Sequence, residues 1–278
     1  MLIEKIGEIF HRLNSKLTDG DFKSASEIFI ELVNARNDLA KEKGYLNYLD
    51  FQKKSVQEIP NSDWKKYLDN RDEFASKYGA KEDQVHFYPH FLSKIPSVNI
   101  SFPDGAYPLF ELFPAMKNIE NKIDLVIEGS TAKFQYFTDT DRYLITIADT
   151  NLNQKIAMLI HELSHVTNLE MKNHKINSVY ESERGAYSLE FEIAGSISDE
   201  YLIADIREYL MCIVRSEFDE AIFMNPTLFA PTLFNSLLNK YFGNFSDKDD
   251  YRYLRDEKIL MKPLSDLSGA VAVVNVLT

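Results

Sequence analysis

Two histidines and a glutamate lie within five residues near the middle of the chain, in the segment His161-Glu162-Leu163-Ser164-His165. On an α-helix four residues advance about 400°, so both imidazoles leave one face within about 40° of each other. Two neutral imidazole nitrogens held in this way can bind one Zn²⁺ at about 2.0–2.1 Å. Glu162 lies beside them, placed to take a proton from a water at the metal. The motif predicts a zinc site with His161 and His165 as ligands and Glu162 as a general base.

A zinc site of this kind needs at least one more protein ligand, and the residues after the motif limit the choice. The metzincin pattern would place a glycine and a third histidine where this chain has Asn168 and Met171, which excludes that class. A glutamate on a following helix remains, as in His₂Glu sites. Glu183 and Glu190 are seven residues apart and therefore share one helical face. We expect Glu183 to be the third ligand and Glu190 to accept a hydrogen bond from a histidine Nδ1–H.

Helices and a small sheet are predicted to position these residues. The motif helix carries apolar residues at helical spacing and can be capped by Asn151 or Asn153. Short runs of β-branched and aromatic residues precede it, which predicts a small antiparallel sheet. These runs are 123–127, 134–137 and 143–147. Further helices are predicted over about 179–195, 199–222 and 231–242.

The N-terminal region is predicted to be helical throughout. Amphipathic spacing and cap residues indicate helices over about 2–17, 22–39, 46–58 and 62–78. We expect an N-terminal helical lobe over 1–80 and a catalytic lobe over 81–278, built as one continuous structural unit. The periodicity of the apolar tail 269–277 does not decide between a buried strand and a helix. The predicted fold class is mainly α (α+β).

Composition excludes several classes of partner. The net charge of −12 argues against nucleic acid and disfavours anionic membranes. No apolar run is long enough to span a membrane, and the N-terminus lacks the features of a secretory signal. Cys212 is the only cysteine, so no internal disulfide can form. We expect a cytoplasmic protein with no membrane or nucleic-acid partner, and the sequence does not give its oligomeric state.

Three segments together resemble one family of zinc metallopeptidases, the thimet oligopeptidase and oligoendopeptidase F family. The segment 143–150 and the HELSH motif are followed by 183–191, which matches both glutamates of the family's E-x-x-S-x-x-x-E pattern and has Ala186 at the serine position. Upstream, 35–50 looks like the family's A-R-x-x-x-A-x-x-x-G-Y-x-N-Y segment. The resemblance implies a zincin-like fold with helical lobes, a zinc ion and short peptides as substrates. It also implies that this is an unusually short member.

The chain departs from that family at two places. The family motif usually continues to a third histidine, where this chain has Asn168. Members also carry a C-terminal histidine and tyrosines that bind the substrate carbonyl and the oxyanion. The corresponding region here offers no histidine, and only Tyr251 and Tyr253 could supply phenols. The resemblance thus makes Tyr253 a candidate catalytic residue, with weaker support than the motif residues have.

Three functions follow from these patterns. The leading one is a zinc-dependent metallopeptidase that hydrolyses short peptides, with the strand at 143–148 pairing with an extended substrate. A second is an aminopeptidase-like gluzincin, although its usual eighteen-residue gap would put the third ligand at Arg184. The third is a catalytically impaired zinc- or peptide-binding protein derived from such a peptidase, because the C-terminal donors are not found.

Overall fold

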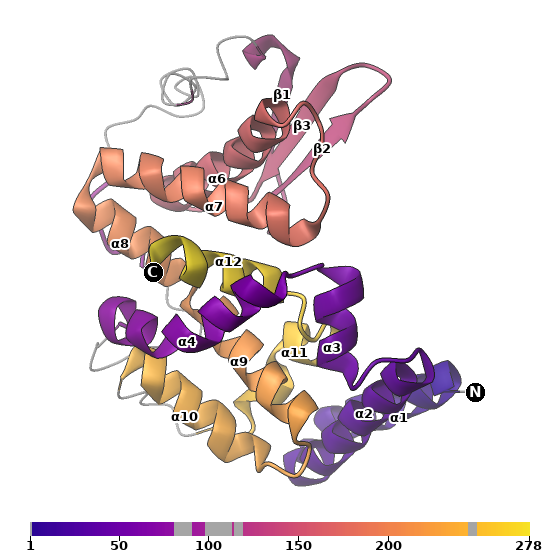
Figure 1. The fold of residues 1–278 in the computed structure, drawn as a ribbon. Helices are drawn as coiled ribbons and strands as arrows, with labels where there is room; N and C mark the ends of the chain where they lie inside the picture. Colours follow the sequence, from indigo (N-terminus) through magenta and orange to yellow (C-terminus); the bar gives the residue numbers. More distant parts are fainter. Residues whose placement is uncertain (1, 81–90, 98–112, 114–118, 244–248) are drawn as a thin grey trace. The chain divides into compact units, whose positions relative to one another are not determined.

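The computed structural model describes residues 2–80, 91–97, 113, 119–243 and 249–278 (Figure 1). The chain divides into two compact units. One, called here the central unit, is Pro89–Glu208; the other, the terminal unit, combines Met1–Tyr88 with Tyr209–Thr278. The expected lobes 1–80 and 81–278, built as one continuous structural unit, stay a prediction.

The terminal unit is helical wherever it is described. Its N-terminal half contains α1 (Leu2–Thr18), α2 (Phe22–Glu42), α3 (Tyr48–Phe51), a π-helical turn (Gln52–Val56) and α4 (Asn61–Tyr78). Its C-terminal half contains α9 (Leu210–Met224), α10 (Ala230–Phe242), a 3₁₀ turn (Arg252–Arg255), α11 (Glu257–Met261) and α12 (Leu267–Leu277). The ends follow local chemistry: the Asp21 side chain accepts a hydrogen bond from the Ser24 N–H at the start of α2, and α4 ends at Gly79.

The C-terminal tail, which the periodicity left undecided, is the helix α12. Residues 270–274 are fully buried, and α12 packs against α4 and α9 within the terminal unit. A helix that is apolar on every side is stable only when other elements enclose it. The tail is therefore part of the core of this unit.

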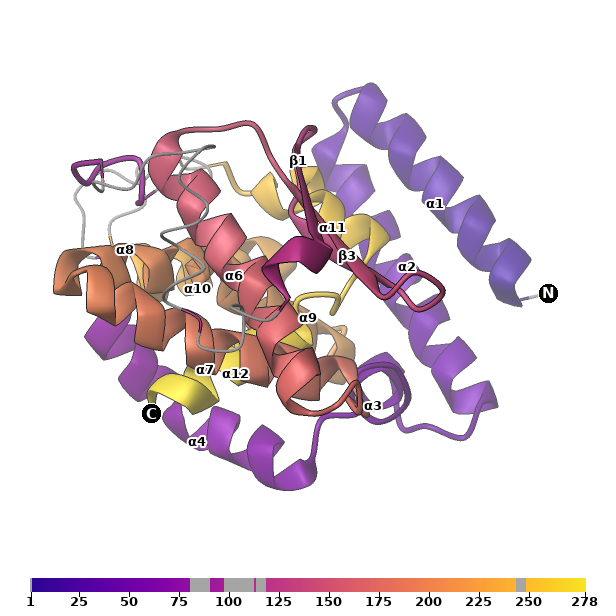
Figure 2. The ribbon, with the colours of Figure 1, turned by 90° about the horizontal axis from the view of Figure 1, so that it is seen from above.

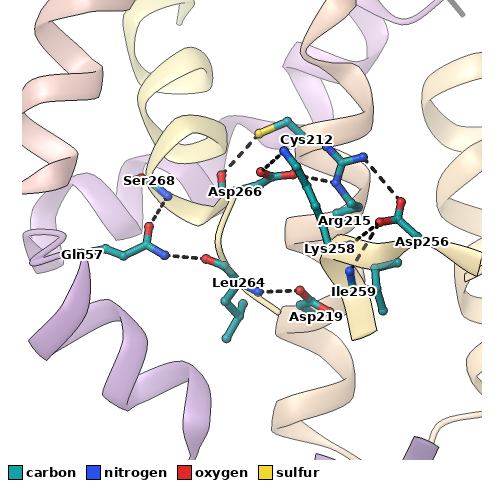
Figure 3. Close-up of polar contacts among 10 residues, drawn as sticks. All are labelled: Gln57, Cys212, Arg215, Asp219, Asp256, Lys258, Ile259, Leu264, Asp266 and Ser268. Carbon is teal, nitrogen blue, oxygen red and sulfur yellow. Dashed lines mark hydrogen bonds and ion pairs between the residues drawn. The ribbon is translucent and has the colours of Figure 1, made fainter. Parts of the chain in front are cut away.

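A cluster of polar side chains fixes the loop before α12 (Figure 3). Arg215 on α9 donates to Asp266 over 2.6 Å and lies 3.5 Å from Asp256. Leu264 has a left-handed backbone with φ of 63°, and its N–H donates to buried Asp219 over 2.7 Å. The Gln57 amide donates to the Leu264 carbonyl. These bonds satisfy backbone groups that a buried loop would otherwise leave unpaired.

The central unit contains a short three-stranded sheet. The strands are β1 (Ile123–Ile127), β2 (Lys133–Phe137) and β3 (Arg142–Ile147), preceded by a 3₁₀ turn (Glu120–Lys122). Their order is β1-β3-β2, with β2 antiparallel and β1 parallel to β3. The predicted sheet is confirmed, but it is mixed rather than antiparallel. The local pattern of apolar and turn residues identifies strands and turns, but it does not indicate which strands pair. Here β1 pairs with β3 and not with β2, its neighbour in sequence.

Three helices complete the described part of this unit: α6 (Leu152–Met171), α7 (Val179–Ile197) and α8 (Asp199–Glu208). Helix α6 contacts both β2 and β3 and also packs along α7 (Figure 2). The predicted single helix over 199–222 is two helices, α8 and α9, which separate at Tyr209. Apolar spacing continues across this point, so the sequence does not mark the break, which coincides with the boundary between the two compact units.

The observed architecture is mainly α with a small sheet placed just before the motif helix, as the zincin-like prediction required. Among the described residues, no helix combines the length and apolarity needed to cross a bilayer.

Candidate metal centre

Three potential ligands converge within the central unit. His161 and His165 lie one turn apart on α6, and Glu183 lies on the first half of α7. The two Nε2 atoms are 3.1 Å apart, and the Glu183 carboxylate oxygens lie 3.9 Å from His161 Nε2 and 3.7 Å from His165 Nε2. Within the described part of the chain, this is the one group of three or more His, Cys, Asp or Glu side chains with ligand atoms in such proximity.

The spacing of these atoms fits a tetrahedral zinc ion. Donors about 2.1 Å from one tetrahedral centre lie about 3.4 Å from each other. The three separations bracket that value, at 3.1, 3.7 and 3.9 Å. Two imidazoles and one carboxylate are also the donor types of His₂Glu sites. The residues present therefore fit a zinc ion.

Both histidines are held by a partner at the other ring nitrogen. His161 Nδ1 lies 2.7 Å from a Glu190 oxygen, and His165 Nδ1 lies 2.9 Å from the Ser182 hydroxyl oxygen. A partner at Nδ1 fixes the orientation and tautomer of the ring, so that the Nε2 lone pair is left for a metal. Glu190 thus has the contact that the sequence predicted for it. Ser182 was not predicted.

The helices that carry these residues are set by local sequence and by one close contact. The Asn151 side chain caps α6 by accepting from the Gln154 N–H, and the Ser178 side chain caps α7 by accepting from the Glu181 N–H. The Asn168 side chain of α6 lies directly against Gly185 of α7, leaving no room for a β-carbon there. Asn168 thus occupies space between the helices at the position where the resembling family has a third histidine.

Glu162 is buried beside the ligands, with 5% of its surface exposed. The backbone N–H of Phe134 on β2 lies near its carboxylate. Burial raises the pKa of Glu162 to about 7, and the nearby Glu183 and Glu190 act in the same direction, whereas His161 and the Phe134 N–H oppose them. A carboxylate whose pKa lies near neutrality can both accept and return a proton.

The two histidines differ in their electrostatic surroundings. Burial lowers the pKa of His161, but the carboxylates of Glu190, Glu183 and Glu162 outweigh it and raise the pKa to about 10. Burial and the adjacent His161 lower the pKa of His165 to about 3. Excess negative charge therefore surrounds the point on which the Nε2 atoms converge, which suits a cation.

Tyr253 belongs to the terminal unit, whereas the metal cluster belongs to the central unit. It is fully buried, its phenol pairs with the Ser26 hydroxyl over 2.6 Å, and its ring packs against Phe29 and Phe218. These contacts are those of a core tyrosine, and none of them is with a residue of the motif.

Sequence reasoning missed three residues of the site. Ser182 precedes the expected ligand and follows no pattern of its own. Phe134 lies in a predicted strand, and its ring stacks on His165 with centroids 5.2 Å apart, but strand partners cannot be read from one sequence. Asp205 of α8 is buried, and the nearby Glu190 contributes, after burial, to raising its pKa well above its ordinary value. The one feature of the sequence that could have indicated Asp205 is an acidic residue placed among neighbours such as Tyr201 and Ile206, which are buried.

Solved metallopeptidase structures share this fold. An oligoendopeptidase F superposes with a TM-score of 0.65 at 17% identity, over 93% of this chain and 55% of that one. The M32 carboxypeptidase from Deinococcus radiodurans R1 gives a TM-score of 0.62 at 12% identity, over 99% of this chain and 65% of that one. Metallocarboxypeptidase 1 of Trypanosoma cruzi gives 0.63 at 11%, over 98% and 65%.

The chain thus spans less than two thirds of the length of each of these structures. No family model and no curated protein sequence matches it. At these identities the likeness establishes the fold alone, which this chain shares with these solved metallopeptidase structures.

Proposed function

We propose that this protein is a zinc-dependent metallopeptidase that hydrolyses short peptides. The observation that carries the proposal is the convergence of His161, His165 and Glu183 beside a buried Glu162. The shared fold with solved metallopeptidases supports it. The single cysteine, which is free, is consistent with work in a reducing cytoplasm.

The side chains divide the chemistry between them. The Nε2 atoms of His161 and His165 and the Glu183 carboxylate would hold the zinc ion. When bound, zinc supplies a Lewis acid that activates water and polarises a substrate carbonyl. Glu162 takes the proton of the attacking water and delivers it to the leaving amine, a task suited to its pKa of about 7. Glu190 and Ser182 keep the two imidazoles oriented.

The strands are suited to binding an extended peptide substrate by backbone pairing. The expectation that the strand at 143–148 binds it is wrong, because β3 is the central strand and is paired on both sides. Strand β2 has one pairing edge left, the edge away from β3, and its Phe134 N–H lies near Glu162. Successive residues of a strand direct their backbone groups to opposite edges, so Tyr136 presents its N–H and C=O on the same side. We propose that the peptide adds to this edge of β2.

A second candidate is a zinc- or peptide-binding protein that has lost turnover. It is favoured by Tyr253, the phenol expected to stabilise an oxyanion, which is buried in the terminal unit and paired with Ser26. Removal of one oxyanion donor typically costs a peptidase about 10²–10³ in kcat. An enzyme in which the Tyr253 phenol stays buried and paired with Ser26 would need another donor or would turn over slowly.

One experiment separates these functions. The purified protein is assayed for zinc content and for cleavage of a mixed peptide library, before and after removal of metal with a chelator. Glu162→Gln should retain zinc and lose cleavage by about 10³-fold or more, since the side chain no longer accepts a proton. Glu192→Gln, a change at an exposed glutamate of α7, is the matched control and should cleave like the wild type.

The outcomes are distinct. Internal cleavage that is lost with the chelator and restored by Zn²⁺ supports the peptidase. Release of single N-terminal residues would replace it with the aminopeptidase-like alternative. Stoichiometric zinc without cleavage of any peptide would leave the binding protein, and absence of zinc at micromolar free metal would refute the whole proposal.

A further inference from the structure

One face of strand β2 carries two aromatic rings that stack on imidazoles. Burial alternates along the strand, so that Phe134 and Tyr136 are half-buried and the other residues of the strand are exposed. The Phe134 ring stacks on the His165 ring, with centroids 5.2 Å apart and planes 20° from parallel. The Tyr136 ring stacks in the same way on His174, at 4.7 Å and 21°. Strand β2, which packs against α6, is thus joined to a candidate metal ligand by a ring contact.

The two ligand imidazoles are held by different kinds of partner. His161 Nδ1 lies 2.7 Å from a carboxylate oxygen of Glu190, whereas His165 Nδ1 lies 2.9 Å from the hydroxyl oxygen of Ser182. A hydrogen bond to a carboxylate is roughly twice as strong as one between neutral groups. The ring of Tyr187 near His161 is tilted by 48°, so it is not parallel to that imidazole. His165 therefore has the weaker polar anchor of the two, together with the parallel aromatic neighbour.

A hydrogen bond at Nδ1 leaves one motion of the His165 ring open. The Ser182 hydroxyl and a metal at Nε2 both lie near the plane of the imidazole, so they set its tautomer and its direction. They do not by themselves stop the ring from tilting about the line that joins them. A parallel ring opposes this tilt, because tilting drives one edge of the imidazole into the aromatic face and opens a gap at the other edge.

We propose that Phe134 is a positioning residue of the metal centre, whose ring holds the plane of His165 so that Nε2 faces the point shared with His161 and Glu183. The proposal rests on the zinc site of the proposed function and adds to it a residue of the sheet that acts through one ligand. It requires a flat ring at position 134, and an apolar side chain of another shape does not suffice. Residues that orient a ligand in this way change metal affinity by about 10–100-fold when removed.

The test separates the flat ring from its apolar character. Phe134→Tyr keeps the ring, whereas Phe134→Leu keeps an apolar side chain and loses the flat face. Dissociation constants for Zn²⁺ are measured by competition with a chromophoric chelator, and the visible absorption spectrum of the Co²⁺-loaded protein reports the geometry at the ligands. We expect Phe134→Tyr to bind Zn²⁺ within about threefold of the wild type, and Phe134→Leu to bind it about tenfold more weakly with an altered Co²⁺ spectrum.

Two further leucine replacements on the same strand are matched controls. Tyr136→Leu removes the neighbouring stack on His174, so it should lower thermal stability without changing the Zn²⁺ dissociation constant. Phe137→Leu changes an aromatic residue that is 42% exposed, and it should alter neither quantity. Equal losses of zinc affinity in Phe134→Leu and Tyr136→Leu would overturn the proposal, by showing a general effect of loosening β2.

The remaining outcomes distinguish this proposal from the proposed function. Wild-type affinity in Phe134→Leu, or equal losses in Phe134→Tyr and Phe134→Leu, would overturn the positioning role and leave the zinc site standing. A wild-type protein that binds no Zn²⁺ would refute the proposed function and the positioning role together. The readout needs no peptidase activity, so a protein that binds zinc without cleaving peptides still tests the role of Phe134.

Discussion

The Asn168 side chain of α6 fills the space into which a side chain on Gly185 of α7 would extend. A β-carbon at Gly185 would lie 2.2 Å from Asn168 Nδ2 and 2.4 Å from its Cγ. Asn168 follows His165 by three residues, and Gly185 follows Glu183 by two. The contact therefore limits how closely the two helices approach near the point where their candidate ligands His165 and Glu183 meet.

Gly185→Ala should consequently push α6 and α7 apart. We expect a loss of about 1–3 kcal/mol in the free energy of unfolding, as for other overpacked interiors, and weaker Zn²⁺ binding. Chemical denaturation and chelator competition measure the two effects. The double variant Asn168→Ala/Gly185→Ala should recover both, because the shorter side chain at position 168 leaves room and alanine is favoured over glycine in a helix by about 1 kcal/mol. Additive losses in the double variant would disprove the steric origin.

Ser182→Ala should weaken zinc binding. The serine hydroxyl is the partner of His165 Nδ1, and without it the ring can rotate and change tautomer. We expect the Zn²⁺ dissociation constant to rise by about tenfold, as for other outer partners of metal ligands. Ser188→Ala, a change at an exposed serine of the same helix, is the control and should have no effect. Indistinguishable affinities for the two variants would show that Ser182 does not orient the ligand.

The stability of the terminal unit should depend on pH through Asp219. Burial raises the pKa of this carboxyl well above its ordinary value, although the Leu264 N–H and Arg36 oppose the shift. A raised pKa in the folded state means that stability is highest below the unfolded-state pKa of about 4 and falls as the pH rises through the folded-state pKa. Asp219→Asn, which keeps an oxygen for the Leu264 N–H, does not titrate.

The variant should therefore exceed the wild type in free energy of unfolding by on the order of 1 kcal/mol at pH 8, and by less at pH 4. Urea denaturation at both pH values measures this difference. A gap that widens toward pH 4 would contradict the assigned direction of the pKa shift.

Arg215→Met should destabilise the terminal unit strongly. Removal of this guanidinium takes a cation from the buried carboxylate of Asp256 and leaves Asp266 with its remaining ion pair to Lys258. Breaking such a pair typically costs about 3–5 kcal/mol. Arg255→Met removes an arginine that pairs with Asp249 while 55% of its side chain is exposed, so it should cost less than about 1 kcal/mol. Equal melting temperatures of the two variants would refute the distinction.

The metal cluster follows from the sequence because its members repeat at helical spacing. His161 and His165 are one turn apart, and Glu183 and Glu190 are two turns apart, so the sequence alone defines one face of each helix. The contact of Glu190 with His161 agrees with that interpretation. Spacing on a helix is local information, and local information is what one sequence contains.

Contacts between different elements could not be predicted, because one sequence contains only local information. The parallel pairing of β1 with β3 joins residues twenty positions apart in register, as Ile123 with Tyr143, and no local pattern encodes it. The same holds for the position of the Phe134 N–H near Glu162 and of Asp205 near Glu190. The break at Tyr209 also escaped the prediction, because apolar periodicity runs through it.

The Phe134 N–H lies near Glu162, so one backbone group of β2 lies beside the side chain proposed as the general base. A substrate peptide paired with that strand would be positioned relative to Glu162 in steps of about 3.3 Å, the rise per residue of a strand. The register of the peptide on the strand would decide which bond is cut. The position at which the first side chain of the peptide can bind would set that register.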